Sequence, residues 1–295
     1  MAGLLTKMIA AEKKIKAACI DGTAIVDEAA RRHMLSPIAT AALGRTMMGA
    51  LLLAANFKKK EHNLTIRVLG DGPLGGIIVT ANGNFQVRGY VQEPGLELPI
   101  TEVGKLDVGR AVGKSGYLHV TKDLQLKAPY TGTCKLVSGE IAEDFVNYLY
   151  FSEQTPAAVA LGVLVNPDGS VLKAGGYLVQ LLPDAEEDLV KKLEGNIAET
   201  LPVSTLMQQG ISVDVILAEH ILKGFNPVKL IGQETEFFCQ CSKEKLEKTL
   251  ISLGEKELSE IISEQGCAEI TCHFCNQKQL FSREELHSLL AEAKS

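Results

Sequence analysis

The sequence contains no tryptophan, and aromatic residues make up only 5% of its 295 residues. Proteins that bind single-stranded nucleic acid by stacking need exposed aromatic side chains, so this class is not favoured. Strongly basic segments are also missing: the net charge is −6 overall, and residues 237–295 hold seven basic against ten acidic residues, a net −3. A phosphate-binding surface for nucleic acid is therefore not expected.

Long apolar runs are scarce as well. The most apolar stretch, 46–57, is shorter than the roughly 20 residues that span a membrane, and charged residues flank it. The first residues, MAGLLTKMIAAEKK, lack the pattern of a secretory signal, because Lys7 interrupts a short apolar stretch. We therefore expect a cytoplasmic protein with no membrane partner. Stable disulfides are disfavoured in that compartment, so the seven cysteines should be reduced.

Up to residue 183 the sequence mixes helix and strand patterns. Ser36-Pro37 is typical of a helix start, and the apolar residues that follow, to residue 57, predict a buried helix. Turn signals such as Asn82-Gly83 separate some of the strand patterns that come next. Those patterns cover residues 64–70, 76–81, 85–91, 159–165 and 171–182. The mixture predicts an α+β fold class, with a mixed α/β N-terminal domain over residues 1–183.

Residues 184–236 have the pattern of a helical linker, a string of short helices interrupted at Pro202 and Gly210. Asp184 is expected to cap the first helix and Ser204 the second. The segment carries four lysines against ten acidic residues. Helices this short are marginal alone in water, so their order must come from packing on something else. Two interpretations remain open, a structural linker and a metastable segment that is poised to unfold.

Four of the seven cysteines form two tight pairs, Cys239-Gln-Cys241 and Cys272-His-Phe-Cys275. Two such pairs supply four thiolates, which is the number that tetrahedral Zn²⁺ takes. Four thiolates leave no position for water, so the site would be structural and not catalytic. We predict that Cys239, Cys241, Cys272 and Cys275 bind one Zn²⁺ in a small C-terminal zinc-binding domain, residues 237–295.

The remaining cysteines and one histidine have simpler interpretations. Cys19 and Cys134 lie in apolar, strand-like surroundings and are expected to be inert, buried thiols. Cys267 is interpreted as a small apolar residue near the fold; metal binding and a wrong disulfide are the alternatives. His273 is an alternative ligand, although four sulfurs already suffice.

A closed zinc site contributes folding free energy to a small domain, on the order of 10 kcal/mol or more in finger-sized peptides. Oxidation converts thiolates to sulfenic acid and then to disulfide, and neither form holds Zn²⁺ well. Oxidation should therefore unfold residues 237–295. If the helices of 184–236 lean on that domain, they should unfold with it and expose their apolar faces.

The cysteine-rich segment FFCQCSKEKLEKTLISLG…CAEITCHFC resembles the C-terminal zinc module of the heat-shock protein 33 family, bacterial redox-regulated holdase chaperones. The resemblance extends over essentially the whole chain, through segments such as SPIATAALGRTMMGALLLAA, YTGTCKLVSGEIAEDFVNYLYFSEQTP and GVLVNPDGSVLKAGGYLVQLLP. Cys267 departs from the family motif, which has no cysteine expected five residues before Cys272.

The resemblance implies an ATP-independent chaperone, and not an enzyme, that binds unfolding client proteins under oxidative stress and prevents their aggregation. It implies an inactive, zinc-bound reduced form and an active homodimer formed through the N-terminal domain, with the middle segment disordered. It also implies disulfides between near neighbours, Cys239–Cys241 and Cys272–Cys275. From the spacing alone, all three pairings of four cysteines stay open.

Two other functions fit parts of the pattern. Cys272-His-Phe-Cys275 has the C-x-x-C spacing of thiol-disulfide oxidoreductases, although those enzymes need an exposed thiol of low pKa in a βαβ setting. A zinc-ribbon protein that binds nucleic acid is the other alternative. The net negative charge of residues 237–295 argues against it.

Overall fold

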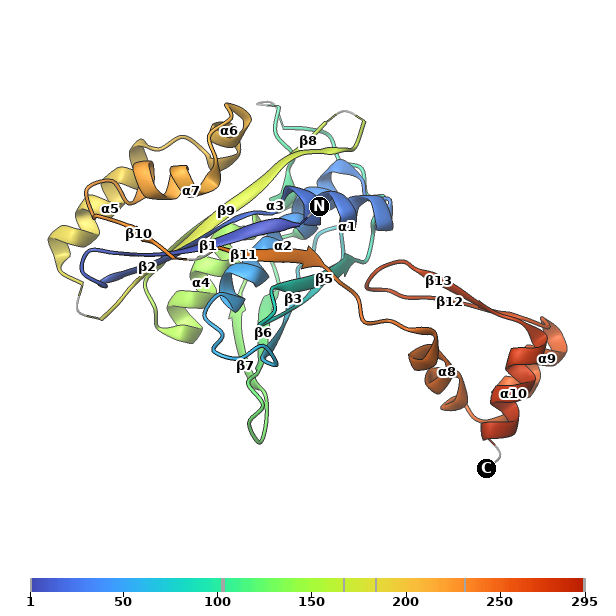
Figure 1. Cartoon of the computed structure of the whole chain (residues 1–295). Coiled ribbons are helices and arrows are strands. Elements are labelled where there is room, and N and C mark those ends of the chain that lie inside the picture. The colour runs from blue at the N-terminus through green and yellow to red at the C-terminus, as the bar shows by residue number, and fades with distance from the viewer. Residues whose placement is uncertain (1, 102–103, 167, 184, 231, 294–295) are drawn as a thin grey trace. The chain divides into compact units, whose positions relative to one another are not determined.

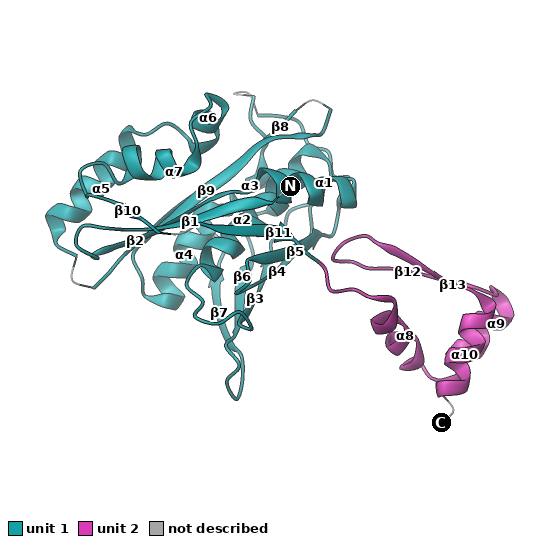
Figure 2. Cartoon of the chain, viewed as in Figure 1, with its two compact units in different colours: residues 1–238 teal, residues 239–295 magenta. Residues whose placement is uncertain are grey.

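The computed structural model describes residues 2–101, 104–166, 168–183, 185–230 and 232–293. The chain divides into two compact units (Figure 2), unit 1 with residues 1–238 and unit 2 with residues 239–295. Unit 1 contains a large, mainly antiparallel sheet with helices packed on it, and unit 2 is a small helical unit with one hairpin. The structure is therefore of the predicted α+β class.

Eleven described strands form the sheet of unit 1, in the order β7-β6-β3-β4-β5-β11-β1-β2-β9-β8, with β10 paired to β1. Their bounds are β1 Gly3–Ala10, β2 Ile15–Asp21, β3 Asn63–Leu69, β4 Gly76–Asn82, β5 Gln86–Val91, β6 Tyr117–Asp123, β7 Tyr130–Lys135, β8 Ala157–Val165, β9 Val171–Leu181, β10 Val228–Lys229 and β11 Gln233–Phe237. Strand β11 runs parallel to β5 and antiparallel to β1. It therefore joins two antiparallel halves of the sheet.

The five strand patterns found in the sequence are confirmed, and they correspond to β3, β4, β5, β8 and β9 to within two residues. Strands β1 and β2 were not predicted from the sequence. Their connection has positive φ angles at Ala11, Glu12 and Lys13, which are 48°, 53° and 75°. Glycine, asparagine and aspartate are the usual residues for such turns, so this hairpin carries no recognisable turn signal.

Helix α2, Pro37–Ala54, is the central element of the unit 1 core. The amide of Ala39 donates a hydrogen bond of 3.3 Å to the Ser36 hydroxyl, so the predicted cap is confirmed. All residues of α2 are buried except Pro37 and Arg45. By length and composition alone α2 would be apolar enough to cross a membrane, but 89% of it is buried inside this unit, as expected of a core helix.

The other helices of unit 1 pack on both faces of the sheet (Figure 1). They are α1 Thr23–His33, α3 Val108–Val112, α4 Ala142–Glu153, α5 Glu187–Glu199, α6 Val203–Gln208, α7 Val213–Val215 and a π-helix, η1 Ile216–Ile221. Helices α1, α3 and α4 contact α2. The helices from α5 to η1 cover the opposite face of β1, β2 and β9.

Residue alternation in β2 shows how the middle segment docks. Ala18 and Ile20 point into the core around α2, whereas Ala17 and Cys19 point into a second core with the linker helices. The linker contributes mainly these side chains to the second core: Leu193, Val203, Leu206, Met207, Val213, Ile216, Leu217, Ile221, Leu222 and Phe225. The support that these marginal helices need is thus the sheet of unit 1.

The details of this segment differ from expectation in several ways. Helix α5 begins after Glu186, which makes no capping hydrogen bond, and the predicted cap Asp184 lies outside the described residues. Helix α6 begins after Pro202, so the predicted cap at Ser204 is wrong. The two strands β10 and β11 were not predicted, because each is short and most of their residues are polar or charged.

Unit 2 has a small core between three helices and a hairpin. Its elements are α8 Lys243–Ile251, α9 Glu255–Glu264, β12 Ala268–Thr271, β13 Lys278–Phe281 and α10 Arg283–Ala293. Gly254, with φ 92°, separates α8 from α9 as predicted. The predicted cap at Ser282 is confirmed, since its hydroxyl accepts from the Glu285 amide and its amide donates to the Glu285 carboxylate.

The close packing of α2 on α4 gives a test of the unit 1 core. A Cβ atom at Gly49 would lie 2.3 Å from the buried Phe145 ring, so Gly49→Ala should lower the free energy of unfolding by about 1–3 kcal/mol. Urea unfolding followed by circular dichroism measures this change. Gly95→Ala is the matched control, because nothing lies within 4 Å of its Cβ position. Equal stability of the two variants would contradict the packing described.

Candidate metal centre

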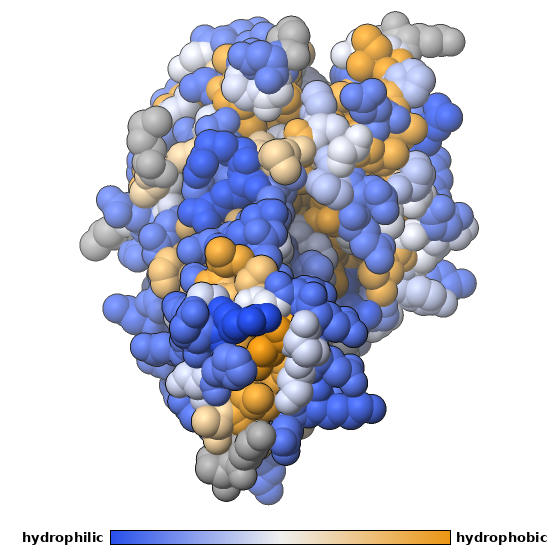
Figure 3. Space-filling model, turned by 90° about the vertical axis from the view of Figure 1, so that its right-hand side faces the viewer, coloured by the Kyte–Doolittle hydropathy of each residue, from blue (hydrophilic) through white to orange (hydrophobic). Residues whose placement is uncertain are grey.

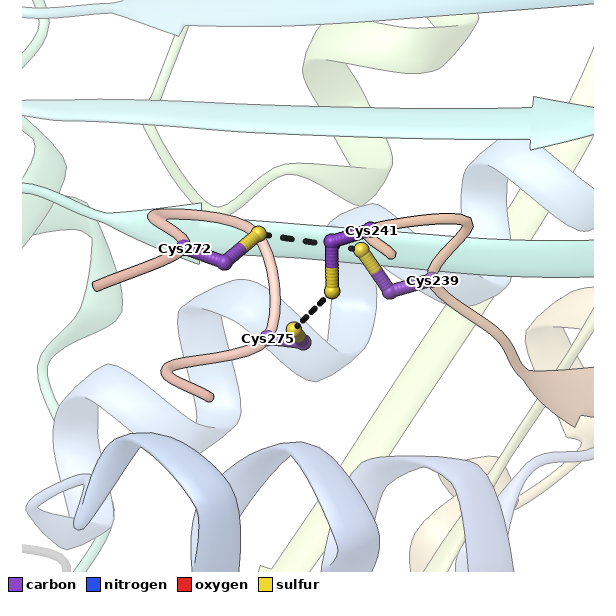
Figure 4. A group of neighbouring side chains, drawn as sticks. All are labelled: Cys239, Cys241, Cys272 and Cys275. Atoms are coloured by element: carbon purple, nitrogen blue, oxygen red, sulfur yellow. Dashed lines mark hydrogen bonds between the residues drawn. The ribbon is translucent and has the colours of Figure 1, made fainter. Parts of the chain in front are cut away.

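The four cysteines of the two pairs meet at one point in unit 2 (Figure 4). The sulfur atoms of Cys239, Cys241, Cys272 and Cys275 all lie within 4.8 Å of one another. Cys275 is buried and the other three are partly exposed. The fold thus brings together four side chains from two segments that are more than thirty residues apart. This is the complete set of site residues that the spacing predicts.

The second pair lies in the tight turn between β12 and β13. The amides of Cys275 and Asn276 both donate to the Cys272 carbonyl, at 3.3 and 2.7 Å, and the Cys272 amide donates to the Gln277 carbonyl. Asn276 has φ 56°, in the left-handed region that asparagine tolerates better than most residues. This turn fixes the two sulfurs on the same side of the hairpin, and Asn276 was not recognised in the sequence as part of it.

The first pair lies between β11 and α8. Ser242 follows Cys241 directly and caps α8, because its hydroxyl accepts a hydrogen bond of 3.3 Å from the Lys245 amide. The amino end of a helix carries a partial positive charge, which stabilises a nearby thiolate. The local sequence therefore places Cys241 at the amino end of α8, where this partial charge acts against the burial that raises the pKa of its thiol.

The sulfur positions fit a tetrahedral metal ion. Four ligands at the usual Zn–S distance of about 2.3 Å form a tetrahedron with edges of about 3.8 Å. The Cys239 and Cys272 sulfurs are 3.8 Å apart, and those of Cys241 and Cys275 are 3.2 Å apart (Figure 4). Both contacts join one pair to the other, so an ion bound here would tie the β11–α8 loop to the hairpin.

Electrostatics in the cluster also favour a bound cation. Burial raises the pKa of the Cys241 thiol, and the sulfurs of Cys275 and Cys239 raise it further. Burial likewise raises the pKa of Cys275. The thiols of Cys241 and Cys275 therefore resist ionisation unless a positive charge is present, and a divalent ion deprotonates coordinating thiols outright.

Nearby lysines have carboxylate partners of their own. Lys243 pairs with Glu285 and also lies 5.6 Å from the centre of the Phe281 ring. Lys278 pairs with Glu269 at 2.7 Å. These ion pairs connect the ligand loop to α10 and β12 to β13, so they support the scaffold of the cluster rather than contributing ligands.

The remaining cysteines lie outside the cluster. Cys19 and Cys134 are buried as expected, and burial raises the pKa of Cys19 to about 12 and that of Cys134 to about 11. Such thiols are poor nucleophiles at neutral pH. Cys267 is exposed, so its interpretation as a small apolar residue near the fold is wrong. It precedes β12 directly, at a position where the side chain faces solvent.

The arrangement does not favour an oxidoreductase. Thioredoxin-like motifs place a reactive thiol on a βαβ unit, whereas Cys272 and Cys275 lie in a two-stranded hairpin. Cys275 is buried and its pKa is raised, which opposes nucleophilic attack at neutral pH. The cluster of four ligands does not include His273, the alternative ligand considered from the sequence.

Comparison with known proteins agrees with this geometry. The sequence profile of a family described as "Hsp33 protein" matches residues 3–282. The chain belongs to the Hsp33 family. This result confirms the resemblance seen in the cysteine-rich segment and in the N-terminal segments of the sequence.

Curated Hsp33 relatives match over nearly their whole length and are named 33 kDa chaperonin. The protein from Desulforamulus reducens is 50% identical over 98% of each chain, and that from Bacillus subtilis is 44% identical over 97% of each chain. The crystal structure of the 33 kDa chaperonin from Thermotoga maritima, an Hsp33 homologue, has a TM-score of 0.91 at 37% identity, covering 98% of each chain. The family thus identifies a chaperone.

The cluster predicts the metal content of single-cysteine variants. The reduced protein should hold about one zinc per chain, and Cys275→Ser should weaken zinc binding by roughly 100-fold or more, because changes outside the ligand shell already cost 10–100-fold. Elemental analysis and competition with a zinc chelator measure both quantities.

Cys267→Ser is the matched control, since Cys267 lies in the same unit but outside the cluster. It should keep full zinc content. Loss of zinc from this variant, or its retention in Cys275→Ser, would contradict the assigned ligand set.

Proposed function

We propose that this protein is a redox-regulated, ATP-independent holdase chaperone of the bacterial cytoplasm, and not an enzyme. In this proposal the reduced, zinc-bound form is inactive, and oxidative stress activates it. The active form is a homodimer that binds unfolding client proteins and prevents their aggregation; nucleic acid and membranes are not partners. Membership of a chaperone family supports the general activity, and the four-sulfur cluster supports its control by oxidation.

The observation that carries the proposal is that unit 2 combines a small apolar core with the four-sulfur cluster. This unit has 57 residues, and its buried apolar core consists of seven side chains: Leu250, Leu258, Ile262, Ala268, Phe281, Leu286 and Leu289. Units below about 70–80 residues rarely fold on such a core without a metal or disulfides. When bound, a zinc ion would supply the missing cross-link between the ligand loop and the hairpin.

Oxidation of the four cysteines would remove this cross-link. Each disulfide forms when two thiols lose two protons and two electrons, and one hydrogen peroxide molecule is reduced to two waters. The proposed pairs are Cys239–Cys241 and Cys272–Cys275. Each of these lies within one segment, whereas the 3.8 Å contact of Cys239 with Cys272 and the 3.2 Å contact of Cys241 with Cys275 join different segments. Oxidation would therefore replace contacts between the loop and the hairpin with bonds inside each of them.

Strand β11 is the connection through which unfolding of unit 2 would reach the linker. It ends two residues before Cys239. The Glu236 amide of β11 donates to the carbonyl of Phe85, which directly precedes β5, and the amide of Phe238, which directly follows β11, donates to the Val87 carbonyl of β5. Among the described residues, the buried Thr235 hydroxyl in β11 has no hydrogen-bond partner, which makes the pairing of this strand in the sheet less favourable. An unfolded chain attached at residue 239 would favour fraying of β11.

The linker helices before β11 are poorly stable by themselves. Helix α5 has 13 residues, while α6, α7 and η1 have six, three and six, and isolated helices of this length are marginal. A π-helical turn such as η1 is rare and less favourable than an α-helical one. Release of β11 would therefore favour melting of the whole segment 184–236.

Melting would uncover a ready-made apolar surface. The face of β1, β2 and β9 under the linker helices is lined by Met8, Ala10, Ile15, Ala17, Cys19, Tyr177 and Val179. Exposed apolar patches of this kind bind partly unfolded proteins. In the structure this face is covered, and on the face seen in Figure 3 apolar residues reach the surface in separate groups among hydrophilic ones. We propose the covered face as the client-binding surface.

Oxidation should therefore switch on the holdase activity. Hydrogen peroxide with mild heat should release zinc, make residues 184–236 sensitive to protease, and increase suppression of aggregation of a thermally unfolding client. Light scattering, a colorimetric zinc assay and limited proteolysis follow the three changes.

Equal suppression by reduced and oxidised protein would refute the regulation. Reduction of insulin by dithiothreitol separates the holdase from the oxidoreductase alternative. Catalytic turnover in that assay, abolished by Cys272→Ser, would instead favour the enzyme.

Linker stability should set how much oxidant is needed. Gly195→Ala places a methyl group in open space within α5 and should stabilise the docked linker by about 0.5–1 kcal/mol. The variant should therefore need harsher oxidation or heating for activation, as measured by half-maximal suppression of client aggregation.

Gly210→Ala is a matched variant with the opposite expected effect on the stability of the linker. Its methyl group also meets open space, but φ is 87°, so alanine there should destabilise the linker by about 1–2 kcal/mol and ease activation. Identical activation of both variants would show that the linker does not control the switch.

A further inference from the structure

A cavity of about 210 Å³ opens on the α2 side of the unit 1 sheet, at the carboxyl end of α2. Strands β1, β2 and β9 form its floor. The end of α2 and the residues just after it form one wall, and Leu230, which follows β10, lies at its edge. None of the lining residues belongs to the cysteine cluster. Lys7 and Lys16 lie on the opposite side of β1 and β2 from the covered apolar face, although Met8 and Ala17 of that face also border the cavity.

Two lysines face this cavity from adjacent strands. Lys7 pairs with Ala18 and Lys16 pairs with Ile9, so the lysines are diagonal neighbours on one face of the sheet, about 7–8 Å apart at their Cα atoms. That separation lets two flexible ammonium groups reach one anion. Lys7 lies 5.3 Å from the centre of the Phe85 ring, and Lys16 donates to the Asn56 side chain.

Among the residues that the structure describes, no acidic side chain pairs with these lysines. None of the described residues that line the cavity is acidic, and neither lysine forms an ion pair within the described part of the chain. Burial lowers the pKa of Lys7, and the charge of Lys16 lowers it further. Lys7 is half-buried and Lys16 is exposed, and a bound anion would offset the repulsion between their two charges.

The rest of the lining is mostly apolar. Leu52, Leu178 and Leu230 contribute side chains from three different parts of the chain. The polar groups Asn56 and Gln180 bond to each other at 2.9 Å, so they are already partnered. A site with positive charge at one end and apolar walls elsewhere fits a ligand that has a negatively charged head group and an apolar body.

We propose that this cavity binds a small amphiphilic anion, a carboxylate or phosphate monoester with a short apolar body. The head group lies between Lys7 and Lys16, and the apolar body lies against Leu52, Leu178 and Leu230. The volume accommodates a chain of roughly eight carbons with its head group.

Because Leu230 belongs to the linker, a ligand in this cavity would also affect the redox switch. This part of the inference rests on the proposed function. Leu230 belongs to the segment 184–236, and its amide donates to the Lys7 carbonyl at 2.8 Å. A ligand that contacts both the sheet and Leu230 binds the docked linker more tightly than the undocked one. By linkage, such a ligand stabilises the docked state and raises the oxidant dose that activates the chaperone.

Binding is tested on the reduced, zinc-loaded full chain with four probes: octanoate, octyl phosphate, octanol and inorganic phosphate. Calorimetry should give saturable, one-to-one binding of octanoate, octyl phosphate or both, with octanol and inorganic phosphate at least tenfold weaker. The two anionic probes distinguish a carboxylate from a phosphate head group. Saturable binding of neither would overturn the proposal.

Variants locate the binding. The double change Lys7→Met and Lys16→Met keeps the apolar stems and should weaken binding at least tenfold, while the double change to arginine should retain it. Lys127→Met, at an exposed position between β6 and β7, is the control and should bind as the parent does. Unchanged binding by the double methionine variant would overturn the site.

Protease protection of the linker tests whether ligand binding affects the redox switch. Saturating octanoate should slow protease cutting of residues 184–236 during peroxide treatment, in the parent but not in the double methionine variant. Intact binding without any protection would refute the link and leave the site in place. The calorimetric result does not depend on holdase activity, so failure of the proposed function would be seen separately.

Discussion

The close approach of four sulfur atoms is the constraint on which the rest of this molecule depends. They come from two separate segments of unit 2, and burial and the neighbouring sulfurs raise the pKa of the Cys241 thiol, so that its ionisation is opposed in the absence of a positive charge. Only a cation turns that crowding into attraction. In the proposed switch, the small core of unit 2 needs the cross-link that a metal ion bound to these sulfurs would supply. An oxidant that reacts with the cysteines would therefore change the fold of unit 2.

Within unit 1, helix α2 and the linker differ in how firmly they are held in the fold. Helix α2 is buried almost throughout and packs against strands from both halves of the sheet. The linker uses short helices, one of them π-helical, and strands of two and five residues. In the proposed switch, the linker opens while the sheet around α2 remains folded.

Much of this was predictable from the sequence because the signals are local. The cysteine spacing identified all four members of the cluster, Ser36-Pro37 marked the start of α2, and Ser282 marked α10. The β1–β2 hairpin was not predicted because Ala11, Glu12 and Lys13 form a turn with positive φ angles, and these residue types are not typical of such turns. Strand β11 was missed because its pairing with β5 and β1 is entirely a property of the tertiary fold. The residues on either side of Cys267 likewise gave no indication that its side chain is exposed.

The position of β11 also affects how the nascent chain folds. Its partners, β5 and β1, are complete once residue 91 has been made, yet β11 itself is not made until residue 237. At a synthesis rate of about 5–20 residues per second, roughly 7 to 30 seconds separate these events. Throughout that interval two strand edges in the middle of the future sheet stay open to neighbouring polypeptides on the ribosome. Translation speed over residues 92–237 thus sets how long this protein is itself at risk of aggregation.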